Sequence, residues 1–310
     1  MSAEALIIGL NQDLAGRSPP LARAEADAEA IMRRLHTLML DMKRVFPSHR
    51  CTLLRGAAAH SRTIGLTLAG APHDVLLLYF SGTMRVDPAR PEDPIALLTY
   101  AGDPAHDLSL RQLIDSCAAR ALVLLLDVLV IGGASASRAA AALTALTPSA
   151  DALPGGYSLV VACSDSPEIK EPPGCLQGAF TATLLRGLTD SAALDQLTGE
   201  QTVGRLARYA RAHLLEVTDR PPLLRHVGRD EGPLLQRRLT SPQRDQLLAA
   251  RQATERQGSQ LRCVGCGLQY RLDQLYMCGH CGNLYCSSCV GPISNAAGRT
   301  FRCACGGRVA

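Results

Sequence analysis

The residues of this chain that could carry out chemistry are concentrated at its C-terminal end. The 310 residues include twelve cysteines, and eight of these fall within the last fifty positions. They form four pairs, Cys263 with Cys266, Cys278 with Cys281, Cys286 with Cys289, and Cys303 with Cys305, at the spacing C-x2-C-x11-C-x2-C-x4-C-x2-C-x13-C-x-C. Eight clustered thiolates predict two zinc ions, each in a closed four-cysteine site of the structural kind, and not a disulfide framework.

The spacing also bears on how the pairs share the ions. Only four residues separate Cys281 from Cys286, which is too short for the second and third pairs to wrap one ion comfortably. We therefore favour interleaving, in which the first and third pairs hold one zinc and the second and fourth hold the other. Two consecutive zinc ribbons are the alternative, and an iron–sulfur cluster is a third arrangement, because several metals accept thiolate ligands.

The stretch MCGHCGNLYCSSC, residues 277–289, resembles the RING and FYVE families of cross-braced zinc modules. RING-type ligase modules grip a conjugating enzyme through an apolar residue between the first two cysteines, and often through a basic residue after the last one. The resemblance thus implies partner-binding roles for Val264 and Arg308. The chain departs from the RING pattern in its final C-x-C pair and in the lack of a ligand histidine, since we expect His280 to be exposed.

Two other ligand classes are not expected for this module. A FYVE lipid site needs a basic, histidine-rich stretch around the third cysteine, where this chain has Leu275-Tyr276-Met277. Residues 261–310 hold five arginines and one aspartate, a net charge of +4 that would suit nucleic acid. Apart from Tyr270 and Phe301, however, the segment has little aromatic surface and no defined reading element. Lysine is scarce throughout, with Lys43 and Lys170 beside thirty arginines, as codon bias in a GC-rich genome would produce.

The preceding residues must form the frame that holds any further site. Four continuously apolar runs are typical of strands buried on both faces of a parallel sheet: Ala5–Leu10, Asp74–Phe80, Ala121–Asp127 and Tyr157–Cys163. Helical periodicity predicts helices over Leu21–Leu40, Ala179–Leu188 and Thr202–Leu215, with a loop at 166–175. The alternation predicts an α/β fold with a mostly parallel sheet flanked by helices.

Composition and local signals divide the chain into a large domain over 1–240, a polar connecting helix over 241–260 and a zinc domain over 261–310. The connecting segment begins with a capping serine and a proline at the first helical position, as helices commonly do. The apolar run Ala121–Val130 is interrupted by Asp127 and too short to span a bilayer. The first residues, MSAEALIIGLN, lack the positive region of a signal peptide, so a cytoplasmic location is expected.

Residues 3–236 resemble the caspase-like cysteine peptidases, in particular their bacterial metacaspase-like branch. The matching stretches are ALIIGLN, DAEAIMRRL, DVLLLYFSG, LSLRQLID, LVLLLD, LVVACSD, GAFTATLLRGL and PPLLRHVG. The family places a histidine and a nucleophilic cysteine after two of its strands, and the resemblance puts them at positions 83 and 129. These are Thr83 and Leu129 here, which can neither relay a proton near neutral pH nor attack a carbonyl. A proteolytically inactive domain is expected.

The resemblance also implies a binding feature that the chain keeps. In the metacaspase-like branch two aspartates form an acidic pocket for a basic substrate residue, and both match here, as Asp127 and Asp165. Without a nucleophile, such a pocket would bind an Arg or Lys side chain of a peptide. The competing interpretation is that the two acids only pair with nearby arginines. Cys163 matches a family cysteine position and is expected to contribute packing.

These features lead to a functional prediction with one alternative. The chain is expected to be a pseudo-caspase fused to a RING-like module that recruits an E2-like enzyme, acting as an E3 in a bacterial ubiquitin-like conjugation system. The alternative is a non-enzymatic adaptor or scaffold in bacterial signalling or defence. Both interpretations predict protein partners and two zinc ions, and neither needs a membrane. Residual peptidase activity, a third possibility, would need a nucleophile that the sequence does not reveal.

Overall fold

The computed structural model describes residues 2–40, 43–68, 73–87, 90, 92–101, 103–146, 153–195, 198–228, 232–237, 261–270, 274–277, 283–286 and 289. The chain separates into two compact units. One comprises residues 1–189 and 201–236, and the other residues 190–200 and 237–310. The expected connecting helix over 241–260 lies outside the described residues, and the domain limits at 240 and 261 stay predictions.

The large unit is built on a mostly parallel sheet, as predicted. Its six main strands are β1 (Ala3–Gly9), β4 (Cys51–Arg55), β5 (Val75–Val86), β8 (Ala121–Ile131), β9 (Gly156–Ser164) and β11 (Leu223–Gly228), in the order β11-β9-β8-β5-β1-β4. All neighbours in this order are parallel except β11, which runs antiparallel to β9. The short strands β6 (Ile95–Leu97) and β7 (Leu108–Ser109) extend the sheet beside the far half of β5.

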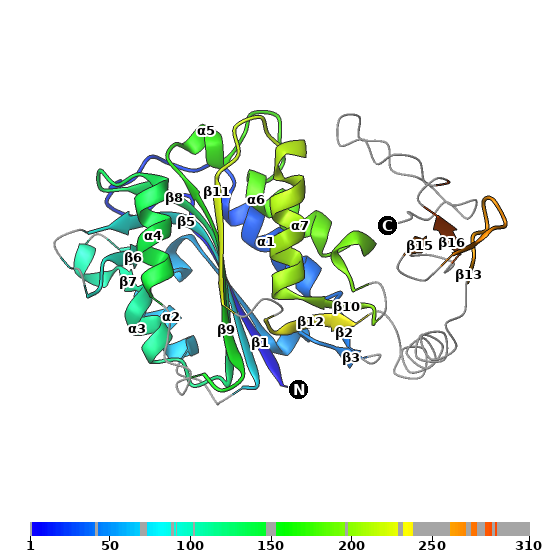
Figure 1. Ribbon diagram of the computed structural model, residues 1–310. Helices are drawn as coiled ribbons and strands as arrows, with labels where there is room; N and C mark the ends of the chain where they lie inside the picture. The colour runs from blue at the N-terminus through cyan, green and yellow to red at the C-terminus, as the bar shows by residue number, and fades with distance from the viewer. Residues whose placement is uncertain are drawn as a thin grey trace. The chain divides into compact units, whose positions relative to one another are not determined.

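Helices cover both faces of this sheet, as Figure 1 shows. One face is covered by α1 (Ala24–Leu35), α6 (Ala179–Gly187) and α7 (Val203–His213), and the other by α2 (Ser61–Leu68), α3 (Leu110–Asp115) and α4 (Ala136–Ala145). Alternate residues of each strand therefore enter two separate cores. Ile7 belongs to the first core and Leu6 and Ile8 to the second, and all three are fully buried. Burial on both faces explains why the strands are continuously apolar.

The remaining elements are short. In the large unit they are β2 (Met39–Leu40), β3 (Lys43–Arg44) and α5 (Pro167–Lys170), and the strands β10 (Glu200–Thr202) and β12 (Leu234–Arg237) form a small sheet of their own. The cysteine-rich segment contains the hairpins β13 (Leu261–Arg262) with β14 (Gln269–Tyr270), and β15 (Leu275–Met277) with β16 (Leu284–Cys286). Among the described residues, no helix has both the length and the apolar character of a membrane span.

The structure corrects four details of the predicted elements. Strands β5 and β8 do not end near Phe80 and Asp127 but stay paired as far as Arg85 and Ile131. They continue because the residues added to β8 are apolar, because those added to β5 are mostly buried, and because β6 supplies a further hydrogen-bonding edge to β5. The predicted loop at 166–175 contains the one-turn helix α5. Helix α1 covers only Ala24–Leu35 of the predicted range 21–40.

Candidate functional site

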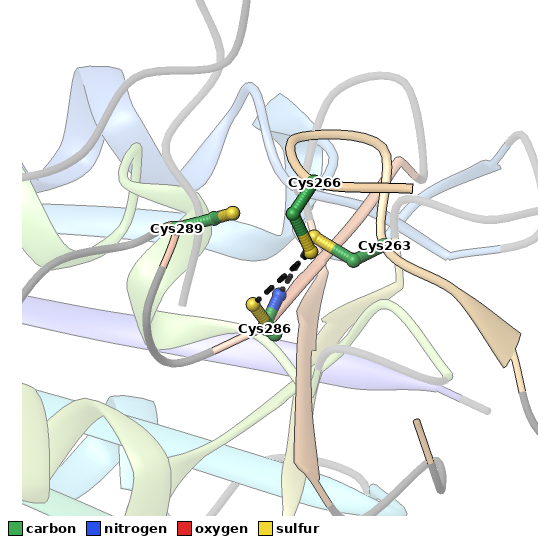
Figure 2. Close-up of side chains that lie close together, drawn as sticks. All are labelled: Cys263, Cys266, Cys286 and Cys289. Atoms are coloured by element: carbon green, nitrogen blue, oxygen red, sulfur yellow. Dashed lines mark hydrogen bonds between the residues drawn. The ribbon is translucent and has the colours of Figure 1, made fainter. Parts of the chain in front are cut away.

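Four cysteines of the C-terminal segment converge on one point (Figure 2). Their Sγ atoms all lie within 4.8 Å of one another. They are Cys263 and Cys266, in the turn between β13 and β14, and Cys286 and Cys289, at and beyond the end of β16. The sulfurs of Cys266 and Cys286 are 3.8 Å apart. Four sulfurs from two hairpins at this spacing can hold one tetrahedral zinc ion.

Backbone geometry positions these sulfurs. Gly267 has φ +72°, a left-handed conformation that glycine adopts without strain, and its N–H donates to the Cys263 carbonyl over 2.8 Å. The N–H of Cys286 donates to Sγ of Cys263 over 3.2 Å, which links the two hairpins. A Cβ atom on Gly265 would stand 2.8 Å from Sγ of Cys289, so only glycine lets that cysteine approach. We did not predict this role for Gly265, because it depends on a contact distant in sequence.

The electrostatics of the cluster favour a cation. Burial alone would raise the pKa of Cys263, but N–H groups of Cys266 and Cys286 directed at its sulfur outweigh this and lower the pKa to about 6. The pKa of Cys289 moves the other way, to about 12, through its hydrogen bonds with the sulfurs of Cys286 and Cys263 and through burial. Ionisation of its neighbours thus hinders ionisation of Cys289. A bound dication removes this hindrance, because thiolates are the form that ligates metal.

The pairing agrees with the interleaved arrangement for one of the two predicted sites. The first and third cysteine pairs come together, as that arrangement requires. The second site is different, because its four predicted ligands lie outside the described residues, and the second zinc ion therefore stays a prediction. These four ligands are Cys278, Cys281, Cys303 and Cys305.

The residues predicted to surround the zinc ions are only partly described. His280 and Arg308 lie outside the described residues, so their predicted exposure and partner-binding role stay predictions. Val264, the other predicted partner-binding residue, is described, and it is 56% exposed. Leu268, on the same turn, is 60% exposed and was not singled out from the sequence. The turn between β13 and β14 therefore presents two apolar side chains to solvent.

A second candidate site lies in the far half of β5 and β8 in the large unit. Thr83 and Leu129, the positions at which the resemblance placed a histidine and a cysteine, are register partners across these strands. Both are buried, with exposed fractions of 3% and 1%. Leu129 packs in a small apolar cluster with Leu21 and Ala24. The pair is therefore juxtaposed, but its side chains offer neither a nucleophile nor a base.

Asp127 and Asp165 have different environments. Asp127 is fully buried, its Oδ1 lies 3.0 Å from Nζ of Lys170, and its Oδ2 accepts a hydrogen bond from the Thr181 hydroxyl over 2.8 Å. Asp165 accepts a 2.5 Å hydrogen bond from the N–H of Ala136, at the start of α4. The contacts described for the two acids are thus with a lysine and a backbone amide, and not with the arginines of the competing interpretation. A shared peptide pocket stays a prediction, and in this structure Asp127 is enclosed.

A second acid belongs to the buried cluster around Lys170 and Asp127. Asp27 of α1 is fully buried, and both its carboxylate oxygens lie within 3.2 Å of the Gly178 N–H, which donates to them. The Ser81 hydroxyl accepts from Nζ of Lys170 over 2.9 Å and contacts Asp27 at 3.4 Å. Asp27 was not singled out from the sequence. The available signal was an acid on the face of the helix whose other residues are apolar, such as Ala28 and Ile31.

The Asp27 carboxyl gives the large unit a predicted pH dependence. Burial raises its pKa from 3.8 to about 7, Lys170 opposes the rise, and Asp127 and Glu171 add to it. Between pH 3.8 and about 7 this carboxyl binds more protons in the folded state than in the unfolded state, so it stabilises the fold at low pH. Its contribution declines as the pH rises towards 7. In urea unfolding, the free energy of Asp27→Asn minus that of the wild type should increase from pH 4 to 7 and level off above. A flat difference would contradict this.

Comparisons with known proteins give structural similarity only. No family model and no curated protein matches this chain. A structural-genomics protein from Geobacter sulfurreducens is similar with a TM-score of 0.47 and 18% identity, over 77% of this chain and 99% of that one. Caspase-1 from Spodoptera frugiperda is similar with a TM-score of 0.45 and 12% identity, over 76% of this chain and 90% of that one. The structure of its pro-form is similar with a TM-score of 0.41 and 11% identity, over 72% of this chain and 90% of that one.

Proposed function

We propose that this protein is a RING-like E3 of a bacterial ubiquitin-like conjugation system, in which an inactive caspase-like domain serves as the recognition frame. The observation that carries the proposal is the convergence of the first and third cysteine pairs, which leaves Val264 exposed on the turn between two ligands. A turn that presents two apolar side chains, Val264 and Leu268, to solvent suits the binding of another protein. The reaction takes place in the cytoplasm under this proposal.

The large unit supports recognition better than catalysis. Thr83 and Leu129 face each other across β5 and β8 without a nucleophile or base. Cys163, which lies beside Val128 across β8 and β9, is buried, and burial with the charges of Asp165 and Asp127 raises its pKa to about 12. Such a thiol is protonated near neutral pH and attacks poorly. We therefore propose that this unit binds a target or partner and cleaves nothing.

The proposed ligase would supply proximity and not a covalent intermediate. A carrier enzyme would hold the ubiquitin-like protein as a thioester, and the zinc module would orient that thioester towards a target lysine. The lysine amine attacks the carbonyl carbon, the C–N bond forms, and the carrier cysteine leaves as its thiol. Holding the two reactants in an attacking geometry is a recognised source of rate enhancement.

A single-turnover discharge assay tests the proposal. A thioester-charged E2-like protein is mixed with the wild type, with Val264→Arg, with Arg308→Ala, and with the control Leu66→Arg. Leu66 is 71% exposed and lies on α2 of the other unit, so the control places the same charge away from the zinc module. We expect Val264→Arg to reduce the acceleration at least about tenfold, the size of an interface hot spot, and the control to reduce it little.

The outcomes separate the two function classes. Acceleration that is lost in Val264→Arg and kept in Leu66→Arg supports the ligase. If the wild type binds zinc and gives no acceleration with any charged carrier, the ligase proposal fails. The protein is then better described as a binding adaptor in bacterial signalling or defence.

A further inference from the structure

The buried lysine of the large unit is unusual in this chain. Arginine is the ordinary basic residue here, with thirty copies against two lysines. One lysine, Lys43, is exposed on β3, whereas Lys170 is fully buried. An ammonium is a compact point charge, while a guanidinium is a broad planar fork, so the two are not interchangeable in an enclosed site. The burial of Lys170 therefore indicates a site shaped around a small cation.

The groups that receive this cation belong to the rigid frame of the unit. Ser81 on β5 and Asp127 on β8 contact Nζ of Lys170 directly, and Asp27 on α1 lies behind Ser81, 3.4 Å from its hydroxyl. Helix α6 closes the site from another side, since a Cβ atom on Gly178 would stand 2.9 Å from Oδ2 of both aspartates. Asp127 thus pairs with the ammonium directly and Asp27 is reached through the Ser81 hydroxyl, so two acidic groups surround one lysine. Such a site favours cations whatever chain supplies them.

The cation itself comes from a peripheral segment. Residues 166–175, which we name the strap, contain the one-turn helix α5, at the edge of the sheet where β8 ends (Figure 1). The strap is latched to the segment before α1 by Glu171, whose carboxylate accepts N–H bonds from Ala22 over 2.7 Å and from Arg23 over 2.9 Å. The Arg23 guanidinium donates to the Pro172 carbonyl over 2.8 Å. This latch lies at the surface, where water can replace its hydrogen bonds at small cost.

The fit between strap and site is incomplete. Oδ1 of Asp127 is buried and lies 3.0 Å from Nζ of Lys170. Within the described part of the chain, however, no donor is aligned with that oxygen as a hydrogen bond. A buried carboxylate oxygen with an ion-pair partner but no aligned donor retains capacity for a ligand. The site can therefore bind a basic group that is better directed than Lys170.

We infer that the strap is an intramolecular occupant of a cation site formed by Asp27, Ser81 and Asp127, and that a basic side chain of a partner protein replaces Lys170 when the strap withdraws. This inference rests on the proposed role of the large unit as a recognition frame. It adds that recognition is gated, because the site is filled until the Glu171 latch opens. The space beside this site on β8 is also filled, because Leu129 packs against Leu21.

The first test empties the site and refills it with a small cation. Lys170→Ala removes three carbons and the ammonium, which propylammonium replaces, while 1-propanol has the same shape without the charge. Propylammonium at ten times its Kd should raise the Tm of Lys170→Ala by roughly 3–5 °C. It should not raise that of Lys170→Met, in which the space is filled. Equal shifts with 1-propanol, or none with propylammonium, would overturn the cation site.

The second test keeps Lys170 and opens the latch, so it does not depend on a variant that lacks the buried charge. A fluorescein-labelled peptide with a single arginine is titrated into wild type and Glu171→Ala, with its citrulline counterpart as the neutral control. Glu171→Ala should bind the arginine peptide at least about tenfold more tightly than wild type does, and the citrulline peptide no more tightly. Equal affinity in both proteins would overturn gating. Neither assay involves conjugation, so failure of the ligase proposal would leave both results as they stand.

Discussion

Replacing Cys263 and Cys278 together will remove both zinc ions from the chain, whereas replacing Cys263 and Cys286 together will remove only one. In the interleaved arrangement Cys263 and Cys286 belong to the same site, as their clustered sulfurs indicate. Cys278 then belongs to the second site, and the first double variant damages both. Two consecutive ribbons reverse the result, because Cys263 would share a site with Cys278, and Cys286 would belong to the other.

The experiment counts zinc per chain in the Cys263→Ala/Cys278→Ala and Cys263→Ala/Cys286→Ala variants by native mass spectrometry. Structural zinc binding contributes about 10–16 kcal/mol of apparent free energy in small zinc domains, so loss of a ligand has a large effect on retention of the ion. Cys117→Ala/Cys175→Ala is the matched control, since both thiols are partly exposed and lie in the large unit. It should keep two ions. One ion in the first variant and none in the second would show consecutive ribbons.

The sheet was predictable from the sequence because its physical cause is local. A strand buried on both faces must be apolar at every position, so the runs that became β1 and β9 could be recognised without knowing their neighbours. The convergence of the first and third cysteine pairs was predictable for a similar reason, since the short gap between Cys281 and Cys286 limits which pairs can share an ion. In both cases a constraint over a few residues determines the result.

The buried cluster around Lys170 was harder to predict because its contacts are distant in sequence. Lys170 meets Ser81 across 89 residues, and Asp27 meets the Gly178 N–H across 151. Nothing in the stretch SPEIKEPPGC indicates that its lysine is buried, since prolines and charges are typical of an exposed loop. The extra length of β5 and β8 is also a tertiary effect, because β6 arrives from a later part of the chain to pair with β5.

The removal of Lys170 should strongly destabilise the large unit. Lys170→Met keeps most of the side-chain volume but leaves the buried Asp127 without its ion-pair partner, close to Asp27. Leaving a buried charge uncompensated costs about 3–5 kcal/mol of folding free energy. Urea unfolding followed by circular dichroism measures the loss. The matched control is Lys43→Met, the only other lysine, which is exposed and should change stability by less than about 0.5 kcal/mol.

A second substitution separates the ion pair from simple packing. Asp127→Asn keeps an acceptor for the Thr181 hydroxyl and removes the charge, while Lys170 retains Ser81 and the attraction of Asp27. This single variant should therefore lose less stability than Lys170→Met. Combined with Lys170→Met it should restore part of the loss, because the uncompensated carboxylate is gone. If the double variant is no more stable than Lys170→Met, or if Lys170→Met behaves like Lys43→Met, Asp127 does not depend on Lys170 for its burial. Residues 166–175, which carry Lys170, would then contribute packing alone.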